Sequence, residues 1–302
     1  MLNIQAVEEH LATLSQSQRE RLCHIDFKLY FLGSVNRTDL VSRFGIKEAA
    51  ASRDMSLYKD LAPKNIEYDT KAKTYIQRES FSPIFQYSSS QTLTALLHGF
   101  GDDFVGIEKP IVSCEAPTQL NLPNIATLAC ITRAIHNNKV LKVSYRSLTS
   151  GTSEREISPV ALVDNGLRWH VRAYDRMRDR FADFVINRIE KTILVSEVIP
   201  DAQTKLADHE WNKIIELSIV PHPNLEYPET IMFEYGMAAG ELRIQTRAAV
   251  AGYLLRKWNV DCSEQHQIRT PESHLWLKNS QILNGITSAS LAPGFNILRG
   301  KN

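Results

Sequence analysis

Several patterns that would mark a secreted, membrane or zinc-binding protein are missing from this sequence. The four cysteines are far apart and form no C-x-x-C pair, so we expect neither a disulfide framework nor a zinc site. No apolar run approaches the roughly 18–20 residues that span a bilayer. The first residues include early acids and no apolar signal core, which argues against secretion. The sequence therefore predicts a cytoplasmic protein without a membrane partner.

Signatures of catalysis are missing as well. The nine histidines are scattered, and the chain contains no H-x-x-x-H, D-x-D or G-x-S-x-G run and no glycine-rich phosphate loop. His170 beside Arg172 imitates part of a phosphodiesterase site, but no carboxylate or nucleophile stands at a useful spacing. Since an enzyme needs a nucleophile, an acid–base pair or a metal cluster, we expect no catalytic residues, no bound metal and no cofactor.

The charge is nearly balanced overall but unevenly distributed. With 302 residues, 43% of them hydrophobic and 23% charged, the chain suits a globular protein of two or three domains. Its net charge of +1 combines two basic zones with a mildly acidic C-terminal part. Residues 36–78 hold nine basic against six acidic side chains, residues 139–191 eleven against seven, and residues 194–302 ten against twelve. A local basic surplus is what a nucleic-acid surface requires.

The first basic zone has the pattern of a winged helix-turn-helix. Asn36 can cap a helix, with Asp39 three residues later in the capping-box position, and Gly45 permits a turn. A second helix is expected from near 46 until before Pro63, and a hairpin with strands over 66–68 and 73–76 follows. Residues 16–32 are expected to form the first helix of the same unit. In such a fold the second helix of the motif enters the major groove of DNA.

The second helix of this motif has two different faces. Ala51, Met55 and Tyr58 fall on the side expected to pack on the preceding helix. The opposite side carries small residues, which allow close approach to base edges, and the fork of Arg53, which suits guanine or phosphate. The predicted DNA-binding residues are Arg37, Lys47, Ala49, Ser52, Arg53, Ser56, Lys71 and Lys73. The alternative is that two packed helices and a hairpin serve protein contacts.

The remaining chain predicts a small β-rich domain followed by an αβ unit. Residues 90–99 suggest a short helix, and one strand is expected near 111–113. A helix over 123–137 and strands over 139–146, 156–163, 167–175 and 181–187 come next, with a hairpin turn at Asp164-Asn165-Gly166. Such spacing indicates a strongly bent sheet or barrel. After Pro200 we expect helices over 207–216 and 247–258 and strands over 230–235, 241–246, 265–269 and 274–278.

The strand expected at 167–175 alternates between apolar and polar residues. Its predicted polar face carries Arg168, His170, Arg172 and Tyr174. If Tyr145, Ser147 and Arg188 point the same way, these side chains form a concave basic patch. Arginine forks beside an aromatic ring suit a phosphate-bearing ligand or an unstacked base. The alternative is a surface sheet with solvated arginines.

These segments resemble a WYL domain, a family named after a Trp-Tyr-Leu motif. The run Trp169-His170-Val171, with two departures from the name-giving residues, is preceded by Tyr145-x-Ser147 and by ISP at 157–159, and is followed by NRI at 187–189. The order of winged helix-turn-helix, WYL domain and C-terminal extension resembles WYL-family bacterial transcription regulators, in particular the BrxR/CapW-type repressors of phage-defence systems. SRD at 52–54 and NIEYD at 65–69 support that resemblance.

The resemblance implies an α+β protein with an N-terminal winged helix-turn-helix, a central Sm-like β-barrel and a C-terminal αβ dimerisation extension. The expected boundaries are 1–80 for DNA binding, 81–122 for a connector, 123–198 for the WYL domain and 199–302 for the extension. Within the WYL domain, the effector site would be lined by Tyr145, Ser147, His170, Arg172 and Arg188.

The expected function is a homodimeric repressor that binds an inverted-repeat operator in double-stranded DNA. It would sense a nucleotide or another nucleic-acid-derived effector and control a phage-defence gene cluster. The alternative is a WYL-type accessory protein that binds single-stranded nucleic acid and modulates a partner enzyme. The small groove-facing residues favour the repressor, because a docking helix more often has an apolar stripe.

Overall fold

The computed structural model describes residues 4–98 and 120–295, and the strand expected near 111–113 lies outside them. The described chain divides into two compact units. Unit 1 consists of Met1–Pro159, Asp175–Arg178 and Ile186–Val198, and unit 2 consists of Val160–Tyr174, Asp179–Val185 and Ile199–Asn302.

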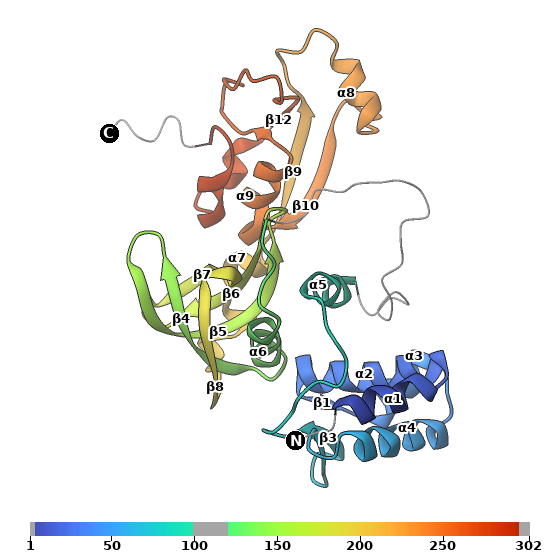
Figure 1. Ribbon diagram of the computed structural model, residues 1–302. Coiled ribbons are helices and arrows are strands. Elements are labelled where there is room, and N and C mark those ends of the chain that lie inside the picture. Colours follow the sequence, from blue (N-terminus) through green and yellow to red (C-terminus); the bar gives the residue numbers. More distant parts are fainter. Residues whose placement is uncertain (1–3, 99–119, 296–302) are drawn as a thin grey trace. The chain divides into compact units, whose positions relative to one another are not determined.

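Unit 1 begins with a winged helix-turn-helix (Figure 1, blue to cyan). Its elements are α1 (Ile4–Thr13), α2 (Gln16–Leu32), β1 (Ser34–Val35), α3 (Arg37–Phe44), α4 (Glu48–Leu61), β2 (Ile66–Asp69) and β3 (Thr74–Gln77). The three strands form a small sheet in the order β1-β3-β2. The helix expected over 16–32 and the two helices and hairpin expected after it are confirmed, whereas α1 was not anticipated.

Local chemistry explains where these helices begin and end. The Ser15 side chain accepts a hydrogen bond from the Gln18 backbone N–H, which caps α2. Asn36 and Asp39 form a reciprocal capping box at the start of α3. Gly33 and Gly45 end α2 and α3 with φ values of 85° and 62°, a left-handed conformation that glycine adopts without steric penalty.

The helices pack through apolar side chains, and the buried carboxyl group of Asp26 lies between them. Leu22, Ile25 and Leu29 of α2 are fully buried, and each stabilises the fold by roughly 1.5–3 kcal/mol. Asp26 lies among them and accepts hydrogen bonds from the hydroxyl groups of Tyr58 (2.5 Å) and Tyr87 (2.7 Å). Burial raises the pKa of Asp26 to about 6 in spite of these hydrogen bonds.

The rest of unit 1 is attached to the end of α2. It comprises α5 (Ser89–His98), α6 (Ile125–His136), β4 (Lys139–Ser147), part of β5 (Gly151–Asp164), the 3₁₀ turn η2 (Ile186–Arg188) and β8 (Ile189–Val198). On α6, Arg133 Nη1 donates to the carbonyl of Tyr30 (2.5 Å) and Asn137 Nδ2 donates to that of Leu32 (2.9 Å). These bonds join α6 to α2, so the helix that opens the β-rich region belongs with the winged helix-turn-helix.

The central sheet has the strand order β7-β6-β5-β4-β8. The four strands expected from the sequence are present as β4, β5, β6 (Trp169–Asp175) and β7 (Arg180–Val185). The fifth, β8, was missed, because Ile193 and Leu194 are consecutive and both exposed, so the strand shows no alternation. Since β7 and β8 are the ends of the order, closure into an Sm-like barrel stays a prediction.

Unit 2 contains a second sheet with the strand order β10-β9-β12-β11. Its further elements are η3 (Asp201–Gln203), η4 (Lys205–Ala207), α7 (His209–Asn212), β9 (Ile214–Pro221), α8 (Pro228–Glu234), β10 (Leu242–Arg247), α9 (Ala248–Lys257), β11 (Val260–Asp261), β12 (Leu275–Leu277), η5 (Ser280–Leu283) and η6 (Thr287–Leu291). The core between sheet and helices includes Leu217, Ile219, Leu255 and Leu277. None of the described helices is both long and apolar enough to cross a bilayer.

Three expectations for unit 2 are wrong. The helix expected over 207–216 is only the single turn α7, and the chain then enters β9, whose alternate residues Ile215, Leu217 and Ile219 are buried. The strand expected over 230–235 is the helix α8, which begins with proline at its first position. No strand forms over 265–269, while β10, α9 and β12 confirm the other expectations.

Two buried groups of unit 1 give opposite pH dependences. Burial, reinforced by Arg43 and Lys28, lowers the pKa of His24 to about 3 from 6.5. The folded state therefore disfavours the protonated imidazole, and the free energy of unfolding decreases as the pH falls below 6.5. The raised pKa of Asp26 acts in the other direction, because its contribution is lost as the pH rises from 3.8 through about 6.

We therefore expect Asp26→Asn to expose the His24 effect. Between pH 6 and pH 4 the free energy of opening of α2 should fall by roughly 1–3 kcal/mol in this variant, since one proton is worth about 1.4 kcal/mol per pH unit. In the unmodified chain the two groups oppose each other and the fall should be smaller. Hydrogen exchange of α2 peptides, corrected for intrinsic rates, measures the opening free energy in the variant and in the unmodified chain. If that free energy changed equally with pH in both proteins, the opposing roles of Asp26 and His24 would be contradicted.

Candidate DNA-binding surface and ligand site

The α4 helix shows a different chemistry on each side. Its inner residues Ala51, Met55 and Tyr58 are at most 1% exposed. On the opposite side Arg53 is exposed, together with Ala49 and Ser56, while Ser52 is half-buried. The helix thus offers a narrow outward face with small side chains and one guanidinium, as its periodicity predicts.

Polar contacts to α2 fix the rotation of α4 about its axis. Arg21 of α2 donates two hydrogen bonds to the carboxylate of Asp54, from Nε (2.6 Å) and from Nη2 (3.3 Å). One turn later Tyr58 donates to the buried Asp26. The carboxylate of Asp54, next to Arg53 in sequence, is only 3% exposed and is neutralised by Arg21. Its negative charge is therefore withdrawn from the outward face.

Basic residues stand at the N-terminal ends of α3 and α4. Arg37 is exposed, and its Nη1 lies 3.5 Å from the hydroxyl oxygen of Ser52, to which it donates. Lys47 is the exposed N-cap residue of α4, and among the described residues no side chain caps that helix. A lysine beside uncapped backbone N–H groups favours an anion such as a DNA phosphate.

The wing is a hairpin held by a side chain. Asp69 Oδ1 accepts hydrogen bonds from the backbone N–H groups of Lys71 (2.8 Å) and Ala72 (3.0 Å). Lys73 closes the turn with a φ of 52°, in the left-handed region. Both lysines are exposed. The turn therefore places two cations at the tip of a hairpin whose register is fixed by pairing of β3 with β1 and β2.

The five residues predicted to line a ligand site are divided between the units. Tyr145, Ser147 and Arg188 belong to unit 1, whereas His170 and Arg172 belong to unit 2. Tyr145 is 9% exposed on β4. The Ser147 hydroxyl accepts hydrogen bonds from the backbone of Thr149 and Ser150, so it stabilises the β4–β5 turn. Arg188 is half-buried at the end of η2.

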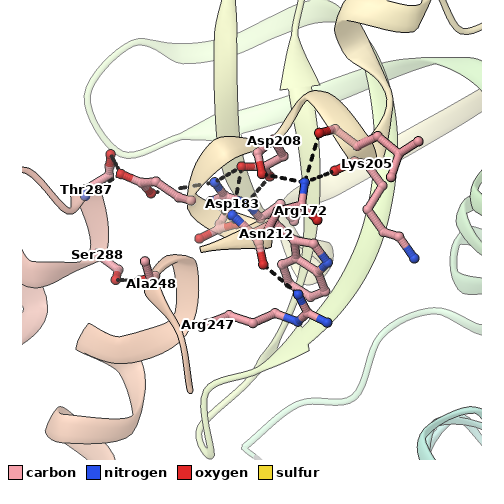
Figure 2. A network of polar contacts seen from close by, with 12 residues as sticks. Arg172, Asp183, Lys205, Asp208, Asn212, Arg247, Ala248, Thr287 and Ser288 are labelled. Atoms are coloured by element: carbon pink, nitrogen blue, oxygen red, sulfur yellow. Dashed lines mark hydrogen bonds and ion pairs between the residues drawn. The ribbon is translucent and has the colours of Figure 1, made fainter. Parts of the chain in front are cut away.

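Arg172 does not present the open cation that the sequence predicts. Its side chain is only 4% exposed and forms ion pairs with Asp208 (2.6 Å) and Asp183 (3.2 Å), as Figure 2 shows. Burial alone would lower the pKa of Arg172, but these two carboxylates raise it above its usual value. Alternation along β6 identified a polar face correctly, yet that face is covered by another layer instead of solvent.

The Arg172 ion pairs belong to a larger polar network in unit 2 (Figure 2). Asp208 also accepts a hydrogen bond from the backbone of Trp211, which caps α7. Asp183 accepts one from the Tyr253 hydroxyl (2.9 Å), and the Tyr253 ring lies 5.2 Å from that of His170. The network joins the β6–β7 hairpin to α7 and α9, which lie in the C-terminal part of the chain.

A third carboxylate extends the network to η6. Glu210 lies 3.6 Å from Arg172 Nη2 and accepts two hydrogen bonds, both of 2.8 Å, from the backbone N–H and the hydroxyl of Thr287. None of these partners was anticipated from the sequence. Asp208 is 36 positions from Arg172, and no local spacing signals a contact over that distance.

His222, which lies between two prolines, is buried as well. Its Nε2 is 3.2 Å from Asp261 Oδ2, and Asp261 accepts backbone hydrogen bonds from Ser263 and Ile268. This pair therefore fixes an irregular loop. Within 4–98 and 120–295, no three His, Cys, Asp or Glu side chains are grouped so that they could hold a metal ion.

Comparisons with known families match three consecutive parts of the chain. Residues 17–99 match the family described as BrxR transcriptional regulator winged helix-turn-helix domain. Residues 126–193 match the WYL domain. Residues 214–283 match the family described as BrxR transcriptional regulator, C-terminal dimerization domain. The expected fold class, with these three parts in this order, is confirmed.

Curated relatives match most of the chain. The DNA-binding transcriptional repressor CapW of Escherichia coli (strain KTE188) is 34% identical over 274 residues, covering 87% of this chain and 89% of the relative. CapW of Pseudomonas aeruginosa is 35% identical over 273 residues, with the same coverage. CapW of Stenotrophomonas maltophilia is 34% identical over 255 residues, covering 81% and 84%. Among solved structures, proteasome accessory factor B/C (PafBC) of Arthrobacter aurescens covers 95% of this chain and 49% of that chain at 13% identity, with a TM-score of 0.25.

The Arg172 network leads to an expectation for stability. Arg172→Ala should destabilise unit 2 by about 3–5 kcal/mol, because it leaves the buried carboxylates of Asp208 and Asp183 without their positive counter-charge. Arg168→Ala, an exposed arginine just before β6, is the matched control and should change stability by less than about 1 kcal/mol. Urea unfolding followed by tryptophan fluorescence measures both, since all four tryptophans lie in unit 2. Equal urea midpoints would show that the network contributes no stability.

Proposed function

The chain belongs to the family of DNA-binding transcriptional repressors that includes CapW, and from this premise we propose that it is a homodimeric repressor that binds an inverted-repeat operator. The family consists of regulators and not of enzymes. The observation that carries the proposal is the outward face of α4, which combines small side chains with the exposed guanidinium of Arg53.

Each part of the proposed surface has its own role in binding. Ala49, Ser52 and Ser56 are small enough for α4 to enter a major groove. There Arg53 would donate to the two acceptors of a guanine edge. Arg37 and Lys47 at the helix ends, with Lys71 and Lys73 at the wing, would contact phosphates and so fix the position of the protein on DNA.

A dimer follows from the size of this surface. A single DNA-binding module buries roughly 600–1,000 Å² on DNA, which gives too few contacts for tight specific binding. Two winged units reading two half-sites would double the contacts and match a two-fold symmetric operator. The match of residues 214–283 to a family described as a dimerization domain supports this arrangement.

The WYL region is proposed to sense a nucleic-acid-derived or phosphate-bearing ligand. The repressor as a whole is proposed to act in the cytoplasm and to control a phage-defence gene cluster. Tyr145, Ser147 and Arg188 of unit 1 remain the proposed ligand contacts, whereas His170 of unit 2 is only 4% exposed, like Arg172. Arg172 acts through its neighbours, by holding the β6–β7 hairpin on α7. A ligand would change DNA binding only if it favours one placement of the two winged units over another.

The direct test is to sequence the fragments that the purified protein selects from genomic DNA. An inverted repeat among the selected duplexes supports the repressor, and selection of single strands alone would favour the accessory-protein alternative. Fragments selected in this way also serve as probes for variants of the DNA-binding surface.

Arg53→Ala should weaken operator binding by about 1–3 kcal/mol and relax the preference at one base pair in each half-site, because the bidentate hydrogen bonds to a base are removed. Arg146→Ala, an exposed arginine on β4, is the matched control and should leave affinity unchanged. Fluorescence anisotropy with a labelled operator at fixed salt measures both. An unchanged affinity of the Arg53 variant would contradict the role assigned to α4.

Lys71→Ala should act differently from Arg53→Ala. Removing a cation that binds phosphate weakens binding to all sequences about equally, and it reduces the steepness of log affinity against log salt by about 1 for each phosphate that is no longer neutralised. Titrations at several salt concentrations, with the operator and a scrambled duplex, measure this slope. A weakening confined to the operator would mean that Lys71 reads bases.

A further inference from the structure

The chain leaves the winged unit through a short segment after β3, residues 81–87, which we call the exit segment. Its Ile84 packs against the apolar cluster that contains the inner residues of α4. Tyr87 packs against a second apolar cluster, to which α5 and α6 contribute Ala95 and Ala129. The exit segment therefore passes from the core around α4 to the core of the helices that lead into the β-rich region.

One carboxylate connects the two clusters. Asp26 of α2 is 0% exposed, and its Oδ1 accepts hydrogen bonds from the Tyr58 hydroxyl of α4 (2.5 Å) and from the backbone N–H of Ile84 (3.3 Å). Its Oδ2 accepts one from the Tyr87 hydroxyl (2.7 Å). An ionised carboxylate only accepts hydrogen bonds, so both tyrosines turn their hydroxyl groups towards it. The same side chain thus holds α4 and the exit segment.

A second set of hydrogen bonds joins the same two elements. Asn65, which is buried between α4 and β2, donates from Nδ2 to the Tyr58 hydroxyl oxygen (3.2 Å) and to the carbonyl of Ser82 (2.6 Å). Its Oδ1 accepts from the backbone N–H of Ser82 (3.1 Å). Hydrogen bonds therefore link α4 to the exit segment by two routes. We call Asp26, Tyr58, Asn65 and Tyr87 the Asp26 hub.

Packing alone does not require a buried carboxylate. Burial raises the pKa of Asp26 to about 6, although its hydrogen bonds favour the charged form. Apolar side chains of similar volume would hold the helices together without that penalty. A buried charge with directional partners instead selects one arrangement of its neighbours, because other arrangements leave it without donors.

We propose that Asp26 is a positioning residue through which the exit segment controls the orientation of α4, and with it operator binding. A movement of α5 or α6 that withdraws Tyr87 leaves the carboxylate partly unsatisfied, so that Tyr58 is no longer held in one place. The helix then samples rotations that turn Arg53 away from the groove, and fewer molecules are competent to bind. The inference rests on the proposed operator binding and names its regulation.

The test is binding of the full chain to an operator fragment selected from genomic DNA. Tyr87→Phe removes one hydroxyl group and should weaken this binding about fivefold, because fewer molecules hold α4 in the competent orientation. Affinity for a scrambled duplex should change by less than about twofold and keep its salt dependence, since it relies on phosphate contacts. Unchanged operator affinity would overturn the proposal. An equal loss on both duplexes would do so too, because it indicates general destabilisation.

Tyr30→Phe is the matched control. Tyr30 of α2 packs against the same cluster as Tyr87, and the two rings lie 5.9 Å apart. Its substitution removes a hydroxyl group from similar surroundings, but the hydrogen bonds that Asp26 accepts from Tyr58, Ile84 and Tyr87 are retained. Operator affinity should therefore stay unchanged. A loss equal to that of Tyr87→Phe would assign the effect to the aromatic cluster and overturn the role of Asp26.

A double-mutant cycle tests whether α4 and the exit segment act through one group. Tyr58→Phe should weaken operator binding as well. Together with Tyr87→Phe it should produce less than the product of the two separate effects, because Tyr87 has no hold on α4 once Tyr58 is released from Asp26. Effects that multiply in full would show independent contributions and contradict the shared carboxylate.

The two hypotheses fail in different ways. If the unmodified chain selects no duplex DNA, the proposed repressor is wrong, and hydrogen exchange of α4 peptides then tests the Asp26 hub by itself. Tyr87→Phe should accelerate that exchange about tenfold, as expected for a lost hydrogen bond to a charged group, and Tyr30→Phe should not. If the unmodified chain binds its operator and Tyr87→Phe alters neither affinity nor exchange, the hub is overturned and the repressor stands.

Discussion

The contact between α2 and α4 fixes the direction in which the proposed reading face points. Arg21 holds Asp54, and Asp26 holds Tyr58, so that α4 cannot turn about its axis without breaking buried polar contacts. Successive residues of a helix point about 100° apart. A rotation by one position would bring Asp54 to the outward face in place of Arg53 and would repel DNA phosphates. The polar core of the winged unit thus determines which charge the outward face presents.

In unit 2, a second buried polar network fixes the position of the β6–β7 hairpin. Arg172 is neutralised by Asp208 and Asp183, because an arginine can be taken out of water only with its charge and its donors satisfied. In consequence the β6–β7 hairpin is fastened to α7 and α9, whereas β4 and β8 pack with α6, which is bonded to α2. The stretch that matches the WYL domain therefore contributes to both compact units.

Two arginines of similar sequence context differ in their exposure to solvent. Arg53 and Arg172 both stand on a polar face that periodicity identifies, yet Arg53 is exposed and Arg172 is 3% exposed. Periodicity says which side chains share a face, but whether solvent or another layer meets that face is a matter of tertiary packing. The same reasoning applies to Phe233. An aromatic residue in an apolar run is expected in a core, but here its side chain is exposed on the surface of unit 2.

The sequence by itself determined the features that depend on neighbours a few positions apart. Asn36, Asp39 and Gly45 set the helix-turn-helix, and Asp164-Asn165-Gly166 set the turn between β5 and β6, because caps and turns are closed by local hydrogen bonds. Only the tertiary structure decided that TIMFEY is a helix, that β8 and β9 are strands, and that Arg172 has Asp208 as its partner. Pro228 at the start of α8 and the alternation along β9 are local signals in favour of what the structure shows, but packing decided between them and the competing patterns. The partner of Arg172 depends on a charge far away in the chain, for which local sequence carries no signal.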